Sequence, residues 1–190
     1  MGKETERLRN LYNLSHVKRW SIVPTTRTEH VAEHSFRVAV LSDFMADRLE
    51  GVRLDRLWLI RSALTHDLDE CFTGDIPSPA KRILQRKDDV LAMIEKEMIP
   101  TDDITPDDKG RECFIVKIAD LLDALWSVRM YGLAPYSVHV TNRLEEAIYK
   151  KAEGGPIYGL DNFDEVLEEV HKAILSPESL VPPWMKPGAF

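Results

Sequence analysis

An all-α fold of six or seven helices is predicted by three features of the sequence. Apolar residues recur every three or four positions along most of the chain, which is the spacing of helices with one buried face. The alternating β-branched runs that mark strands are nearly absent. A chain of 190 residues fits one domain, which buries about 70% of its unfolded surface. We therefore expect a single domain over 1–190, with its helices packed around one core.

The individual helices follow from this periodicity and from helix-ending residues. The expected elements, in chain order, are helices at about 3–15, 29–49, 54–67, 88–98, 111–131, 136–152 and 162–175, with a structured turn at 74–79. Thr28 is the predicted N-cap of the second helix, and Gly51 is its stop. The 111–131 helix is apolar on nearly every face, which predicts a central place in the fold. The acidic loop at 100–109 and the tail after 176 give no indication of function.

Composition excludes several classes of function. The net charge of −7 leaves no global basic field, so we expect no nucleic-acid polymer as a partner. No apolar run reaches the roughly 18 residues of a membrane span, and the first residues, MGKETERLRN, contain no signal-like apolar stretch. The two cysteines, Cys71 and Cys113, have no CxxC spacing and are expected to be buried. A cytoplasmic protein without membrane contact is the expectation.

Charged groups on apolar helices are the candidates for chemistry. Asp120 lies in the middle of the most hydrophobic helix, and Asp123 follows one turn later on the same face. His66 and Asp67 end another apolar helix, and His34 lies inside the long second helix. A buried carboxylate is costly unless it is paired or binds a metal. Convergence of these side chains would form a site for a divalent transition ion, Co²⁺, Mn²⁺ or Zn²⁺ first, with Mg²⁺ as a candidate at a second site.

Each of these residues also has an explanation without a metal. A lone histidine on a helix face is usually a core residue, and a histidine at a helix C-terminus is favoured there electrostatically. The aspartate of the central helix could pair with Arg61 or Lys117. The metal interpretation is favoured because all three explanations would have to hold at once, on helices that should form the core.

The surrounding motifs resemble a known family. They are RW at 19–20, TEHVAEHS at 28–35, HDLDE at 66–70, TGDIPSPAK at 73–81 and KIADLLDAL at 117–125. This ordered set resembles the HD-domain phosphohydrolases, in particular their bacterial 5'-deoxynucleotidase branch, over roughly 10–130. The resemblance implies an orthogonal helical bundle that is often dimeric, so a homo-oligomer is expected. The catalytic core would cover about 10–130, and the C-terminal helices and tail 135–190.

The resemblance also implies residue roles. The metal ligands would be His34, His66, Asp67 and Asp120, and the catalytic groups Glu70, Arg19 and Asp75. The substrate would contact Arg19, Trp20, Ile22, Asp75, Pro79 and Lys81. From the residues themselves, a helix turn continuing past Asp67 would bring Glu70 beside the ligands. There it could position an attacking water or move its proton. Arg19 offers a two-pronged donor for phosphate, and Lys81 could add positive charge nearby.

A narrower resemblance, to phage HD phosphohydrolases that remove the phosphates of dATP, makes dATP the favoured substrate and deoxyadenosine the product. The alternative is a 5'-deoxynucleotidase acting on dNMPs. Two other hypotheses remain open. His30, Glu33 and His34 fit the H-x-x-E-H motif of inverted zinc peptidases, and the chain could instead be a helical binding module without activity. In the phosphohydrolase interpretation, His30 is exposed or lies behind the ligands.

Overall fold

A computed structural model describes residues 3–83 and 109–176 of the chain. Its helices are α1 Lys3–Asn13, η1 Leu14–His16, α2 Val31–Arg48, α3 Arg56–Thr65, α4 Glu70–Thr73, α5 Ser78–Ile83, α7 Gly110–Tyr131, α8 Tyr136–Ala152, η3 Gly155–Tyr158 and α9 Phe163–Leu175. Over these residues the only β pairing consists of two isolated bridges. The all-α prediction is confirmed. The helix predicted at 88–98, residues 100–108 of the predicted loop and the C-terminal tail after 176 fall outside the described residues.

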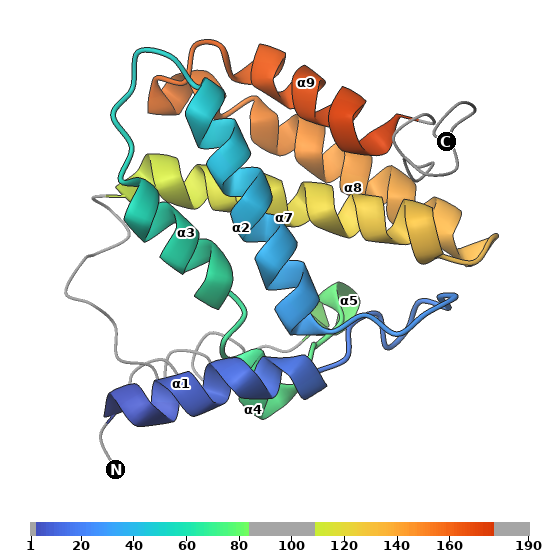
Figure 1. Cartoon of the computed structure of the whole chain (residues 1–190). Coiled ribbons are helices and arrows are strands. Elements are labelled where there is room, and N and C mark those ends of the chain that lie inside the picture. Colours follow the sequence, from blue (N-terminus) through green and yellow to red (C-terminus); the bar gives the residue numbers. More distant parts are fainter. Residues whose placement is uncertain (1–2, 84–108, 177–190) are drawn as a thin grey trace, which may run out of the picture.

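The helix that is apolar all round, α7, is central, as predicted. α2 crosses it, α3 packs beside α2, and α8 lies along α7 with α9 nearby (Figure 1). α7 buries apolar side chains on several faces because neighbours surround it. Among the described helices, none is long and apolar enough to cross a membrane.

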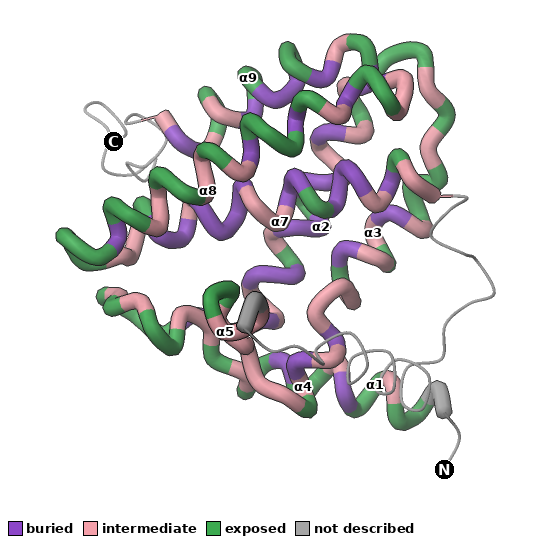
Figure 2. The backbone as a smooth tube through the Cα atoms, turned by 180° about the vertical axis from the view of Figure 1, so that it is seen from behind, coloured by how far each residue is buried: buried purple, intermediate pink, exposed green. Residues whose placement is uncertain are grey.

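The core extends between α2, α3, α7, α8 and α9 and includes the crossing of α2 and α7 (Figure 2). Val38 and Met45 of α2 are fully buried there, as are Ile118, Leu122 and Leu125 of α7. Full burial of each such side chain stabilises the fold by about 1.5–3 kcal/mol. This packing fixes the two helices that carry the polar residues discussed below.

A smaller apolar cluster fixes the other side of the site. It joins Leu14 of η1, Val31 at the start of α2 and Leu68, which follows α3. α1 and α4 lie together on this side of the molecule (Figure 1). The cluster therefore anchors the start of α2 next to the segment that carries His66 and Asp67.

The loop between η1 and α2 is held at both ends by backbone hydrogen bonds. The N–H of Arg19 donates to the carbonyl of Glu29 at 2.9 Å, and the N–H of Val31 donates to the carbonyl of Val17 at 3.0 Å. Further along, the N–H of Thr26 donates to the carbonyl of Tyr131 at 2.7 Å, at the end of α7. These bonds tie the loop to both α2 and α7.

The same pairing explains why the predicted start of the second helix was wrong. α2 begins at Val31 rather than at Glu29, because residues 29–31 are extended against residues 17–19. Its N-cap residue is His30, and Thr28 is exposed and caps nothing. α3 ends at Thr65, so His66 and Asp67 follow the helix instead of closing it.

The predicted turn at 74–79 is shorter in the structure. Gly74 has a φ of 69°, a left-handed conformation that glycine adopts without strain. α5 begins at Ser78, so Pro79 lies in the first helical turn, where proline is tolerated. The short α4, which begins with Glu70, has too few residues to show helical periodicity in the sequence.

Candidate active site

Three ligand atoms converge between α2 and the turn after α3. His34 Nε2 lies 3.3 Å from His66 Nε2 and 3.6 Å from Asp67 Oδ2, and His66 Nε2 lies 3.2 Å from the same oxygen. Ligands bound to one ion at about 2.0–2.1 Å in tetrahedral geometry are about 3.3–3.4 Å apart. The group therefore has the size and the mixed nitrogen and oxygen donors of a divalent transition-metal site. The predicted convergence of these three residues is present.

Both imidazole rings are oriented by hydrogen bonds at Nδ1. The Nδ1 of His34 lies 2.6 Å from Asp123 Oδ2, and the Nδ1 of His66 lies 2.7 Å from the carbonyl oxygen of Ala63. Because each acceptor oxygen calls for a proton on Nδ1, Nε2 is the nitrogen of each ring that can offer a lone pair to an ion, once any proton on it has left. Asp123, which is only 2% exposed, thus orients a ligand. Its only signal in the sequence is its position one turn after Asp120.

Asp120 faces the same two rings. Its Oδ1 lies 3.2 Å from His34 Nε2 and 4.0 Å from His66 Nε2, while its Oδ2 accepts a hydrogen bond from Lys117 at 2.6 Å. Burial would raise the pKa of Asp120, but the His34 hydrogen bond and the charge of Lys117 hold it well below its usual range. The carboxylate is therefore ionised, as a ligand must be. Lys117 is the partner that the explanation without a metal had named.

Asp67 and His66 are both charged in the ion-free protein. Burial would raise the pKa of Asp67, but the hydrogen bond and charge of His66 lower it to about 2. Burial would lower the pKa of His66, but the hydrogen bond and charge of Asp67 raise it to about 8. At neutral pH an entering cation would displace a proton from His66.

Arg19 lies beside this group with unused donors. Its side chain is 10% exposed, and its Nη1 lies 3.9 Å from Asp67 Oδ2. Nε and Nη1 are buried and have no hydrogen-bond partner among the described residues. A buried guanidinium with free donors next to a cation site fits an anionic ligand such as phosphate.

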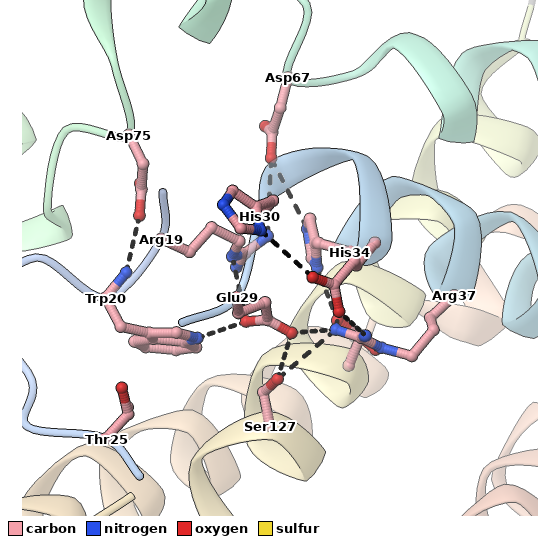
Figure 3. Close-up of polar contacts among 12 residues, drawn as sticks. Arg19, Trp20, Thr25, Glu29, His30, His34, Arg37, Asp67, Asp75 and Ser127 are labelled. Atoms are coloured by element: carbon pink, nitrogen blue, oxygen red, sulfur yellow. Dashed lines mark hydrogen bonds and ion pairs between the residues drawn. The ribbon is translucent and has the colours of Figure 1, made fainter. Parts of the chain in front are cut away.

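Trp20 is held in a left-handed backbone conformation, with a φ of 63°. Its N–H donates to Asp75 Oδ2 at 3.2 Å, and its indole N–H donates to Glu29 Oε2 at 2.5 Å (Figure 3). Non-glycine residues adopt this conformation only where their surroundings impose it, and such residues cluster at functional sites. Here two carboxylates impose it. Asp75 therefore positions Trp20, and its contact with deoxyribose stays a prediction.

Glu70 is buried, with 3% exposed, and has one unused oxygen. Oε1 accepts a hydrogen bond from Lys81 at 3.1 Å, whereas Oε2 has no partner among the described residues. Burial, together with the charges of Asp67 and Asp75, raises the pKa of Glu70 to about 8. Glu70 had been predicted to lie on a continuation of α3, and this prediction was wrong. It enters from α4 after the intervening turn.

Other predicted substrate contacts lie at the edge of this region. The side chain of Lys81 is 31% exposed and forms an ion pair with Glu70. Its ammonium group is therefore already paired and is not an unpaired cation available to phosphate. Ile22 and Pro79 are exposed. Their contact with a base stays a prediction.

The peptidase motif is arranged differently from a metal site. His30 Nδ1 lies 3.3 Å from Glu33 Oε1, and Glu33 also forms an ion pair with Arg27. His34 instead directs Nε2 toward His66 and Asp67. The geometry thus favours the ligand set drawn from separate elements over the single-helix motif.

Neither cysteine is arranged as a nucleophile. Both are free thiols that are half-buried, whereas the sequence had predicted that they would be buried. Burial and the charge of Asp69 raise the pKa of Cys71 to about 11, and burial and Glu112 raise that of Cys113. Thiols of this kind are protonated at neutral pH and unreactive.

A separate hollow lies near the N-terminal ends of α3 and α7 and is lined in part by cations. Arg56 pairs with Asp43 and Asp47, and Arg111 donates to the carbonyl oxygen of Tyr158. Arg56 and Arg111 are thus engaged by protein groups.

The family match covers the N-terminal part of the site. Residues 7–104 match the 5'-deoxynucleotidase YfbR-like family. The chain is 34% identical to a dATP triphosphohydrolase of Salmonella phage PMBT28 over 154 residues, which are 75% of this chain and 76% of the relative. It is 35% identical to the 5'-deoxynucleotidase plu3092 of Photorhabdus laumondii over 135 residues, which are 60% of this chain and 68% of the relative.

Solved structures agree with the fold. A Cyanophage S-2L HD phosphohydrolase bound to dA and one catalytic Zn²⁺ ion has a TM-score of 0.75 at 26% identity, over 92% of this chain and 98% of that one. An HD-domain phosphohydrolase of Listeria innocua has a TM-score of 0.66 at 21% identity, over 93% of this chain and 92% of that one, and supports the fold alone. Together with the ligand geometry, these similarities show that the chain belongs to the YfbR-like 5'-deoxynucleotidase family of HD-domain phosphohydrolases and is a metal-dependent hydrolase of deoxynucleotides.

Proposed function

We propose that this enzyme hydrolyses dATP and releases deoxyadenosine. Phosphate-ester chemistry is supported by the ligand group together with two neighbours of Asp67. Arg19 Nη1, which has no hydrogen-bond partner among the described residues, lies 3.9 Å from Asp67 Oδ2, and Glu70, with one unpartnered oxygen, has its pKa raised in part by the charge of Asp67. The choice of dATP is supported by the reach of the similarity. Three phage dATP triphosphohydrolases match 75%, 77% and 81% of the chain, whereas the 5'-deoxynucleotidases match 56–60%. Hydrolysis of dNMPs is the alternative.

The ion would be held by His34, His66 and Asp67, with Asp120 as the proposed fourth ligand. Imidazole and carboxylate donors suit Zn²⁺, Co²⁺ or Mn²⁺, and Mg²⁺ at a second site stays part of the proposal. When bound, such an ion polarises a phosphoryl oxygen and lowers the pKa of a water molecule.

The chain's own residues would bind the phosphate and move protons. In the reaction, a water oxygen forms a bond to the α-phosphorus, the bond between that phosphorus and the 5' oxygen breaks, and the 5' oxygen takes up a proton, so that deoxyadenosine and triphosphate are released. Arg19 would hold the phosphate through Nε and Nη1, where charge increases in the transition state. Glu70 would relay the proton through Oε2. Its pKa of about 8 lies near the working pH, which favours such transfer.

Base recognition would involve the face of Trp20. We propose that adenine packs against this ring, with Ile22 and Pro79 beside it, while Asp75 keeps the loop in place. The indole is fixed by Glu29, so little side-chain entropy would be lost on binding.

A panel of substrates tests the proposed function. The purified enzyme, loaded in turn with Zn²⁺, Co²⁺ and Mn²⁺, should convert dATP to deoxyadenosine with kcat/KM at least about tenfold above that for dNMPs or ATP, which corresponds to about 1.4 kcal/mol. Products are separated by chromatography. Turnover of dNMPs with dATP inert would establish the alternative instead.

Arg19 offers a second test. Arg19→Met should lower kcat/KM roughly 10- to 150-fold, because hydrogen bonds to a charged group contribute about 1.5–3 kcal/mol. The loss should fall mainly on substrates with phosphate and spare the binding of deoxyadenosine. Lys18→Met is the matched control, since Lys18 is the exposed neighbour. Equal losses in the two variants would contradict a specific phosphate contact.

The setting of the enzyme also remains a proposal. We expect a cytoplasmic homo-oligomer that acts on free deoxynucleotides rather than on a nucleic-acid polymer. These expectations rest on composition and on the family resemblance.

A further inference from the structure

Behind the ligand group lies a buried polar network centred on one arginine. Arg37 of α2 lies between two carboxylates, Asp123 of α7 and Glu29, each only 2% exposed (Figure 3 draws the Glu29 side). Buried charges are stable only when they are paired. The network therefore determines how both acids are held.

One side of the network reaches the metal ligands. Arg37 Nε donates to Asp123 Oδ1 at 2.5 Å, and its Nη2 lies 3.1 Å from Oδ2. The same Oδ2 lies 2.6 Å from His34 Nδ1. Arg37 and the histidine thus share one carboxylate, so the position of Arg37 affects both the orientation and the basicity of the ring.

The other side reaches the substrate loop. Arg37 Nη2 donates to Glu29 Oε1, which also accepts a hydrogen bond from Ser127 at 2.5 Å. The second oxygen of Glu29 accepts the indole N–H of Trp20 at 2.5 Å. Glu29 therefore joins Arg37 to the residue with the strained backbone.

Arginine is suited to this place because its planar donors can serve two acids at once, which a lysine ammonium does less well. The guanidinium also lies over the Trp126 ring, with Cζ 4.9 Å from the centroid, which restrains its plane. Without the cation, two buried carboxylates would lose their common partner and repel one another. Any shift of Arg37 toward one acid weakens its bond to the other.

We propose that Arg37 is a positioning residue that couples occupancy of the metal site to the position of Trp20. The His34 ring, with an ion bound at Nε2, would donate more strongly from Nδ1 to Asp123, and this would change how Arg37 is shared between Asp123 and Glu29. The role of Trp20 in nucleotide binding rests on the proposed function, whereas the coupling itself does not. By linkage, ion and nucleotide would change each other's affinity by the same factor.

The first test measures ion affinity without nucleotide. In ion-free protein titrated with Zn²⁺ against a chromophoric chelator, Arg37→Met should bind roughly 10- to 100-fold more weakly, the usual effect of losing a group that orients a ligand. Arg48→Met is the matched control. Arg48 is on the same helix, stacks on Phe44 and pairs with Glu169, yet it has no link to the ligands. Its Zn²⁺ affinity should stay within about twofold of wild type.

The second test follows Trp20 directly. Its indole N–H resonance is assigned as the one missing from Trp20→Phe, and it should shift when ion-free wild type takes up Zn²⁺. In Arg37→Met the shift should vanish even at saturating Zn²⁺, while Arg48→Met should keep it. Arg37→Lys guards against misfolding, since it retains the charge. It should also lose most of the shift, because one ammonium cannot hold both acids in the same way.

The proposal is overturned if folded Arg37→Met and Arg37→Lys, verified by near-UV circular dichroism, keep wild-type Zn²⁺ affinity or a wild-type Trp20 response. It is equally overturned if Arg48→Met loses the response, since the effect would then be general. Neither measurement uses turnover. An enzyme that fails to hydrolyse dATP would refute the proposed function while leaving this result intact.

Discussion

Asp67→Ala is expected to give a folded protein that takes up no divalent ion and has no measurable hydrolysis of any deoxynucleotide. Asp67 supplies the carboxylate of the three-atom group and lies within 3.6 Å of both ligand nitrogens. It is also the group that holds the His66 ring charged and oriented in the ion-free protein. Its loss removes a ligand outright, so the effect should exceed the 10- to 100-fold typical of residues that only orient ligands.

The fold should survive this change because the Asp67 side chain lies at the surface of the site, 22% exposed, and supports no apolar core contact. Metal content is measured after dialysis by mass spectrometry, and secondary structure by circular dichroism. His30→Ala is the decisive control. It should keep both ion and activity, because His30 pairs with Glu33 and not with the ligand group. Loss of the ion in His30→Ala, with retention in Asp67→Ala, would restore the peptidase hypothesis.

The periodicity of apolar residues predicted those features of the fold that depend on the sequence of a single helix. The helix around Leu122 has apolar residues on every face. Such a helix must be surrounded by other elements, so its central position could be predicted from its own sequence. The convergence of His34, His66 and Asp67 was predictable because buried polar groups must find partners, and three helices offered few alternatives. The family resemblance, rather than the periodicity, implied the roles of the other site residues.

Helix ends and partner choice depend on contacts between distant segments, which no local pattern shows. α2 begins late because Val31 bonds to Val17, and Trp20 is strained because Asp75, 55 residues away, binds its N–H. Arg37 was missed altogether. Its one signal was a cation one turn after His34 on an otherwise buried face, and its meaning depends on Asp123, 86 residues later.

Glu70→Gln is expected to retain the ion but to lower kcat by about 10²- to 10⁴-fold, the usual contribution of a group that moves protons. Glutamine keeps the size of the side chain and can still accept the hydrogen bond from Lys81, but it cannot exchange a proton at neutral pH. KM should change little, because the phosphate is assigned to Arg19. Zn²⁺ stoichiometry is measured alongside steady-state kinetics to separate loss of catalysis from loss of the ion.

The raised pKa of Glu70 also predicts how the unfolding stability of the Glu70→Gln variant depends on pH. The group titrates near 4.5 when unfolded and at about 8 when folded, so between these values the folded ion-free protein binds more protons than the unfolded chain. Its stability therefore falls as pH rises through that window. Glutamine mimics the protonated acid, so Glu70→Gln should lose less stability between pH 5 and about 8, as followed by urea unfolding of ion-free protein.

Glu33→Gln completes the comparison, because it makes the same chemical change at the carboxylate that a peptidase would need. Glu33 lies one residue before His34 yet is paired with Arg27 and His30, which lower its pKa despite some burial. Its contact with Arg37, 4.0 Å between Oε2 and Nη1, is the longest of its ion pairs. Glu33 is thus an ionised group engaged away from the ligand atoms, and its replacement should leave kcat within about twofold of wild type. Near-wild-type turnover in Glu70→Gln would remove Glu70 from the reaction. A severe loss in Glu33→Gln would place the working carboxylate on α2. Because the two variants differ only in position, their ratio measures how much of the chemistry depends on a buried acid with one free oxygen.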